Sequence, residues 1–137
     1  MFVDNWLGLF FLVVMVGFVF RGPVLTAMYK VRTISIHELA ALLSGKNPPI
    51  LLDVRTQIEF DMGHVPNSIL IPLKDLSRAK AEELKERYGE RGIAVICRSG
   101  SRSSMAAVNL RRIGITNVYN VMGGLNAWRV NGYPVKK

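Results

Sequence analysis

Three short apolar runs, each bounded by turn-forming residues, constrain the fold of this 137-residue chain more than any other feature. They occupy residues 50–54 (ILLDV), 93–96 (IAVI) and 118–121 (VYNV). Runs this short and this apolar are typical of strands that are buried on both faces of a sheet. Helical segments separate them, and strands that alternate with helices predict a mostly parallel sheet with helices on both faces.

Two capping boxes predict where helices begin. Ser35 and Glu38 open an amphipathic helix over 36–43, and Thr56 and Glu59 repeat the pattern for a brief helical turn. The other expected elements are a strand over 69–71, helices over 78–89 and 103–113, a C′ glycine at Gly114, and a last short helix after Gly123-Gly124.

Residues 6–20 (WLGLFFLVVMVGFVF) carry no charge at all. A helix that spans a membrane needs roughly 20 apolar residues, and residues 6–29 reach that length if Arg21 extends to the headgroups. A secretory signal fits poorly because Asp4 is the only charge before the run. A buried core helix would need a much larger protein around it. We therefore expect one N-terminal transmembrane helix.

Positive charges set the expected orientation of this anchor. Three of them follow the apolar run and none precedes it: Arg21, Lys30 and Arg32. The positive-inside rule then predicts a single-pass protein of the cell (inner) membrane, with an anchor over 1–32 and a cytoplasmic domain over 33–137. Met28 is an alternative start that would remove the anchor.

The charge balance and the cysteine count exclude several functions. The chain has 18 Lys+Arg against 10 Asp+Glu, which suits a membrane surface, a nucleic acid or a small anionic substrate. Its basic residues show no interleaved aromatics and no nucleic-acid motif, so we expect no nucleic-acid partner. The single cysteine excludes an intrachain disulfide and a cysteine-cluster metal site.

That cysteine, Cys97, directly follows the expected strand over 93–96, at the edge where parallel sheets bind ligands. The residues after it are small or positively charged: Arg98, Ser99, Gly100, Ser101, Arg102 and Ser103. A tight loop of this kind can turn backbone N–H groups inward and, with the next helix N-terminus, form an anion cradle. Such surroundings favour a reactive thiolate. The alternative is that Cys97 is a small buried hydrophobe.

The length of the loop bears on the reaction. Four residues separate Cys97 from Arg102, one fewer than in a cysteine-phosphatase loop. The shorter cradle suits a terminal persulfide, Cys–S–S⁻, whose charge inward N–H groups would stabilise like an oxyanion hole. With one cysteine, a mechanism that ends in an internal disulfide is excluded.

Three segments resemble one known family. Residues 97–103 (CRSGSRS) resemble the active-site loop of rhodanese-like sulfurtransferases, residues 53–66 (DVRTQIEFDMGHVP) its upstream signature, and residues 123–128 (GGLNAW) its C-terminal signature. The resemblance covers nearly all of the expected domain. Two departures, Asn-Ser at 67–68 where Gly-Ala is usual and Leu70 where Asn is common, bear on local packing.

The resemblance implies a rhodanese-like three-layer α/β fold with a five-stranded parallel sheet, and double-displacement sulfur transfer without a metal or organic cofactor. Cys97 would be the nucleophile, Arg98 and Arg102 would orient an anionic donor such as thiosulfate, and backbone N–H groups from Arg98 to Ser103 would hold the persulfide. The acceptor would be a thiophilic molecule or a sulfur-acceptor protein. A membrane-tethered module that binds a partner or senses redox state is the alternative, and a phosphatase or arsenate reductase ranks third.

Other distinctive residues suggest structural roles beside the site. Asp53 and Arg55 flank a strand end, where an ion pair that fixes the loop is favoured over catalysis. His64 is interpreted as a residue that braces its loop, with a general base as the alternative. Glu59 fits a helix cap, and Trp128 is expected to pack against the sheet edge.

Overall fold

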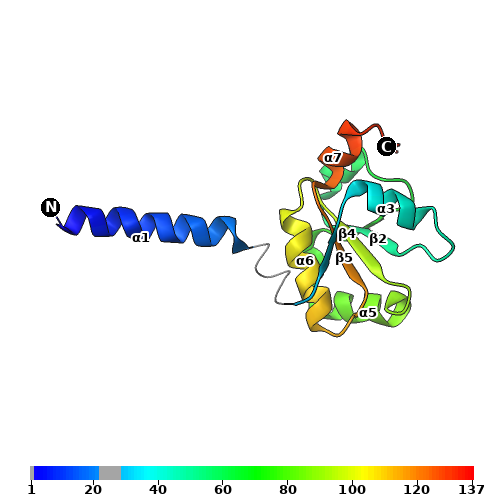
Figure 1. Cartoon of the computed structure of the whole chain (residues 1–137). Coiled ribbons are helices and arrows are strands. Elements are labelled where there is room, and N and C mark those ends of the chain that lie inside the picture. Colours follow the sequence, from blue (N-terminus) through cyan, green and yellow to red (C-terminus); the bar gives the residue numbers. More distant parts are fainter. Residues whose placement is uncertain (1, 22–28) are drawn as a thin grey trace.

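The computed structural model describes residues 2–21 and 29–137, and it confirms the predicted parallel α/β fold (Figure 1). Its elements are α1 (Phe2–Val19), β1 (Arg32–Ile34), α3 (Ile36–Leu43), β2 (Ile50–Asp53), α4 (Gln57–Asp61), β3 (Ile69–Leu70), the 3-10 turn η1 (Leu73–Asp75), α5 (Arg78–Tyr88), β4 (Ile93–Ile96), α6 (Ser101–Arg112), β5 (Val118–Val121) and α7 (Gly124–Val130).

The sheet has five parallel strands in the order β1-β5-β4-β2-β3. β4 lies at its centre, pairing with β2 on one side and β5 on the other. All four β4 residues are buried, as expected for a strand covered on both faces. Because every strand points the same way, the residue after β4 lies at the carboxyl edge together with the residues after β2 and β5.

Helices cover each face of the sheet and bury a separate apolar cluster. Leu84 of α5 and Leu110 of α6 belong to the cluster on one face, together with Leu52 and Val95 of the sheet. α3 and α7 supply the second cluster, which contains the following residues on the opposite face: Ile36, Leu39, Leu125 and Trp128. Figure 1 shows the helices on the two sides of the strands. The central β4 therefore lies between two apolar layers, one on each face of the sheet.

Local signals placed most helix ends correctly. Both capping boxes are present, with Ser35 accepting from the Glu38 N–H and Thr56 accepting from the Glu59 N–H. Gly114 follows α6 with a φ of +100°, as a C′ glycine does. The start of α6 differs from the expectation, because Gly100 caps the helix in a left-handed conformation and α6 begins at Ser101.

β1 is an element that local patterning did not predict. It contains three residues, two of them exposed, and it pairs with β5 through Arg32↔Tyr119 and Ile34↔Val121. A short edge strand with polar residues has no alternating apolar pattern. Only its pairing with a distant strand makes it part of the sheet.

The prediction of a transmembrane helix is not supported. In the described part of the chain, no helix combines the length and hydropathy that crossing a bilayer requires. The expected span over 6–29 includes residues 22–28, which lie outside the described residues, as does the alternative start at Met28.

Candidate active site

Cys97 lies at the carboxyl end of β4, beneath the loop that leads into α6, and only 1% of it is exposed. The Gly100 N–H donates to Cys97 Sγ at 3.0 Å, and Ser103 Oγ lies 3.3 Å from the same sulfur. Gly100 has a φ of +114°, a conformation that glycine adopts without strain. The sulfur therefore faces a backbone donor and the N-terminus of a helix, which both favour an anion there.

Arg102, in the first turn of α6, is held by Glu59 of α4. Arg102 Nη1 and Nη2 donate to Glu59 Oε1 and Oε2 at 2.6 and 2.9 Å. These hydrogen bonds, together with weaker contributions from Thr56, lower the pKa of Glu59 from 4.5 to about 2, and Glu59 in turn raises the pKa of Arg102. Sequence reasoning had assigned Glu59 to helix capping alone. In the structure Glu59 both caps α4 and binds Arg102, so α4 fixes the position of the Arg102 guanidinium beside the cysteine loop.

Asp53 and Arg55 form a buried ion pair beside the site. Arg55 Nη2 lies 2.8 Å from Asp53 Oδ2, and the Arg55 Nε contacts both carboxylate oxygens at 3.0 Å. Arg55 also donates to the backbone carbonyls of Glu59 and Gly63. Buried charges are tolerated only with such partners. The pair therefore links the end of β2 to the middle of α4, at Glu59, and to the loop after it, at Gly63.

The C-terminal signature segment binds the other side of the cysteine loop. At the start of α7, the Leu125 N–H donates to the Cys97 carbonyl at 2.9 Å and the Asn126 N–H to the Arg98 carbonyl at 3.1 Å. Gly124 lies directly against these two carbonyls, where a Cβ would collide with them. The segment thus fixes the loop backbone, a role that the sequence pattern alone did not show.

Trp128 and His64 have structural contacts. Trp128 is buried, donates from Nε1 to the Pro134 carbonyl at 2.8 Å and stacks on Tyr133. His64 stacks on Phe60 with ring centroids 3.7 Å apart, and its Nδ1 lies 3.0 Å from the Phe60 carbonyl. Its backbone pairs with that of Lys136. These contacts brace the loop after α4 and the C-terminal end of the chain.

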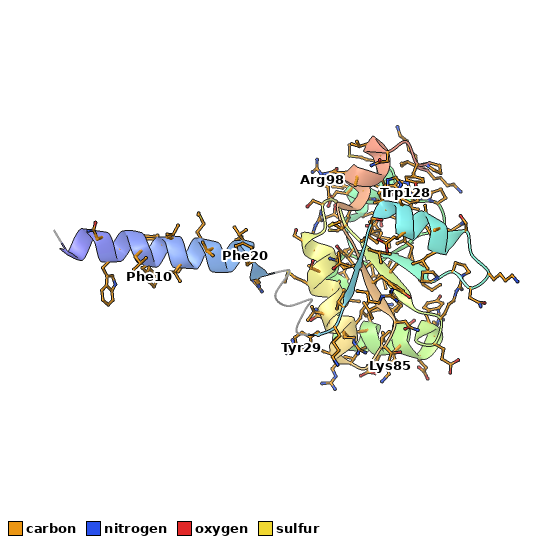
Figure 2. All side chains as sticks on the ribbon, in the orientation of Figure 1. Phe10, Phe20, Tyr29, Lys85, Arg98 and Trp128 are labelled. Atoms are coloured by element: carbon orange, nitrogen blue, oxygen red, sulfur yellow. The ribbon has the colours of Figure 1, made fainter. Side chains whose placement is uncertain are left out.

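Arg98 is exposed at the mouth of a narrow cleft beside the loop. The cleft has a volume of about 160 Å³ and is lined by Arg55, Glu59, Met62, Arg98, Leu125, Asn126 and Arg129. Figure 2 shows Arg98 and Trp128 at the same end of the domain. Arg55 is already paired with Asp53, so the cations of this cleft that remain for an anion are Arg98 and Arg129.

Ser99 and Ser101 are exposed on the opposite side of the loop. They line a larger cleft together with Arg102 and two exposed methionines, Met105 and Met122. Ser103, by contrast, is completely buried and contacts the sulfur. Of the predicted cradle residues, Arg98 therefore lines the smaller cleft, Ser99 and Ser101 line the larger one, and Ser103 lies buried beside the sulfur.

The fold and the site together define a class of α/β domain with a buried cysteine at the end of a central parallel strand, beneath the loop that leads into a helix. The sequence profile of the rhodanese-like domain matches residues 35–131. The chain belongs to the rhodanese-like domain family.

Several characterised proteins are similar to this chain. The Allochromatium vinosum protein named "Sulfurtransferase" is 30% identical over 105 residues, covering 77% of this chain and 94% of that protein. "Thiosulfate sulfurtransferase 16, chloroplastic" of Arabidopsis thaliana is 36% identical, covering 73% and 86%. "Adenylyltransferase and sulfurtransferase MOCS3" of Bos taurus is 39% identical over 69% of this chain. The chain spans only about a quarter, 24%, of that longer protein.

Solved structures show the same fold. A rhodanese-related protein from Thermoplasma volcanium superposes with a TM-score of 0.66 at 35% identity, covering 77% of this chain and 97% of that chain. A rhodanese-like domain protein from Staphylococcus aureus gives a TM-score of 0.64 at 31% identity, covering 78% and 100%.

Proposed function

We propose that this protein is a rhodanese-type sulfurtransferase that carries sulfane sulfur as a persulfide on Cys97. The observation that carries the proposal is the position of the Cys97 sulfur, beneath a loop whose Gly100 N–H points at it from 3.0 Å. Family membership and relatives named as sulfurtransferases support sulfur transfer in general. Thiosulfate as donor and cyanide or another thiophile as acceptor are the specific substrates proposed for testing.

In the first half-reaction the thiol of Cys97 loses its proton to solvent and the thiolate attacks the outer sulfur of the donor. A bond forms between Cys97 Sγ and that sulfur, the donor S–S bond breaks, and sulfite leaves with the electron pair. Arg98 and Arg129 at the cleft mouth attract the anionic donor. The negative charge now lies on the terminal sulfur, where backbone N–H groups of the loop stabilise it.

In the second half-reaction the acceptor attacks the terminal sulfur. The persulfide S–S bond breaks, the new bond forms between sulfur and acceptor, and the thiolate of Cys97 is regenerated. Cys97 is the only cysteine in the chain, so the acceptor must come from outside. A small thiophile or a sulfur-acceptor protein that presents a narrow reactive group would suit a cysteine this deeply buried.

The test is thiosulfate:cyanide turnover by the full-length protein, with Cys97→Ser as the control. We expect thiocyanate from the wild type and none from the variant. Intact mass after exposure to thiosulfate should show the gain of one sulfur atom, lost again with cyanide. Absence of both signals would favour the alternative of a binding or redox-sensing module. Phosphate release from an aryl phosphate, abolished in the variant, would instead indicate a phosphatase.

Membrane attachment through residues 1–32, with the catalytic domain 33–137 on the cytoplasmic side, is a second part of the proposal. It is supported by α1, whose large apolar side chains from Trp6 to Val19 are exposed. Leaving that many apolar side chains in water is unfavourable. Fractionation of cells that express the full-length chain tests it: the protein should stay with membranes after a carbonate wash. Recovery in the soluble fraction would contradict the attachment.

A further inference from the structure

Asn120 is a buried amide near Cys97 that the sulfur-transfer steps above do not use. Among the residues that the structure describes, the buried polar or charged side chains are Asp53, Arg55, Ser103, Ser104 and Asn120. Asp53 and Arg55 bind each other. Asn120 lies on the same face of β5 as Val118, which belongs to the apolar cluster under α6. An amide at such a position is costly unless it is fully hydrogen-bonded.

Ser103, Ser104 and Asn120 form one hydrogen-bond network beneath the cysteine loop. Asn120 Oδ1 accepts from Ser103 Oγ at 2.6 Å, and Asn120 Nδ2 donates to Ser104 Oγ at 2.9 Å. Ser104 Oγ donates in turn to the Gly100 carbonyl at 2.7 Å. That carbonyl is also an acceptor for Ser103 Oγ at 3.0 Å, but it is shared with the Ser104 hydroxyl and the Ser104 N–H, and Asn120 Oδ1 is the shorter partner of Ser103.

The Ser103 hydroxyl therefore binds most closely to Asn120 Oδ1, and a thiolate on Cys97 would compete for its proton. A serine hydroxyl carries one proton and accepts through its lone pairs. When Cys97 is a thiol, its S–H donates to Ser103 Oγ across 3.3 Å, and the Ser103 proton lies on Asn120 Oδ1. When Cys97 is a thiolate, the anion needs that proton, and Ser103 can supply it only by breaking its bond to Asn120.

We propose that Asn120 is a positioning residue for sulfur loading, which withholds the Ser103 proton from the free thiolate and so favours the persulfide. The proposal rests on the function proposed above. In the loaded state the negative charge has moved to the terminal sulfur, the inner sulfur is uncharged, and the Ser103 hydroxyl returns to Asn120. The free thiolate can therefore gain the Ser103 hydrogen bond only if Asn120 loses it, whereas the persulfide leaves the bond between Ser103 and Asn120 intact.

Removing Asn120 tests this directly, because Asn120→Ala frees the Ser103 proton for the thiolate. The midpoint of thiolate formation, followed by absorbance at 240 nm, should fall by about 0.5–1 pH unit, the effect of one hydrogen bond of ordinary strength. Cys97 is the only cysteine, so the thiolate signal belongs to it alone. Above that midpoint, where the free enzyme is the thiolate, the equilibrium constant for persulfide formation from thiosulfate should fall about 3- to 10-fold.

Ser103→Ala provides the second arm, since it removes the hydroxyl through which Asn120 would act. Adding Asn120→Ala to Ser103→Ala should then give no further shift, because Asn120 acts through Ser103. The charged groups around the loop are unchanged in every variant, so the comparison isolates the network: Arg98, Arg102, Asp53, Arg55, Glu59 and Arg129.

Two further variants keep the result decisive. Asn120→Leu has nearly the shape of the amide and should lower the midpoint even if the alanine variant folds poorly. Asn131→Ala removes another amide, which donates to the Ala127 carbonyl at an exposed helix end, and should leave the midpoint of thiolate formation unchanged.

An unchanged midpoint in folded Asn120 variants, or an equal shift with and without Ser103, would overturn the proposal. Failure of the wild type to form a persulfide would overturn the sulfurtransferase function, whereas the thiolate titration would still report on the network.

Discussion

Glu59→Gln removes the charge that holds Arg102 while leaving a side chain that can still cap α4. The Arg102 hydrogen bonds are the largest cause, ahead of those from Thr56, of the lowering of the Glu59 pKa from 4.5 to about 2. A shift of this size corresponds to at most about 3 kcal/mol of folding free energy. The side chains of Arg102 and Glu59 are 32% and 23% exposed, and solvent screening reduces the expected loss to about 1–2 kcal/mol.

The loss should depend on pH in a defined direction. Because the pKa of Glu59 is lower in the folded state, the ion pair stabilises the fold fully above about pH 4.5, and this stabilisation disappears as the pH falls towards about 2. Urea unfolding of the full-length protein, in a non-ionic detergent that keeps α1 in solution and followed by circular dichroism, gives the free energy at each pH. The variant should be less stable than the wild type at pH 7 and nearly equal to it at the acid limit.

Glu38→Gln is the matched control for this experiment. Glu38 occupies the same capping-box position in α3 that Glu59 occupies in α4. In the described part of the chain no ion pair involves Glu38. An equal loss in both variants would show that capping alone explains the effect. A loss in Glu59→Gln that stayed constant down to the acid limit would refute the ion-pair reasoning.

Two further substitutions test the supports of the cysteine loop. Gly124→Ala would push a methyl group into the Cys97 and Arg98 carbonyls, so thiosulfate:cyanide turnover should fall at least about tenfold. Gly132→Ala, also at positive φ but in open space, should keep its turnover, and equal activities would contradict the steric argument. Asp53→Asn leaves a buried guanidinium without its counter-charge and should cost about 3–5 kcal/mol in urea unfolding. An unchanged unfolding midpoint would show that the pair is dispensable.

The sequence predicted the elements whose signals are local. The apolar runs at β2, β4 and β5 and the two capping boxes depend on neighbouring residues, and all of them are present. β1 was missed because its three residues become a strand only by pairing with β5. The same limit applies to the site, where Glu59 and Arg102 are 43 positions apart.

Asn120 illustrates a second limit of sequence reasoning. Within the run VYNV it reads as one polar residue in an apolar strand, and such a residue predicts neither its partner nor its role. Its contacts with Ser103 and Ser104 arise because β5 lies beside β4 and under the start of α6. The signal that could have found it was the amide itself, at a position where burial on both faces favours an apolar side chain.

The burial of the only cysteine also determines how oxidants would affect this protein. A disulfide needs two Cβ atoms about 3.5–4.5 Å apart, and Cys97, with 1% exposure beneath its loop, does not come that close to the same residue of another chain. Covalent dimers are thereby excluded while the domain stays folded. A sulfenic acid formed on Cys97 would find no second cysteine in the chain to convert it to a disulfide. Recovery from oxidation would therefore depend on a small thiol from outside, which must reach Cys97 by the same route as the acceptor of sulfur.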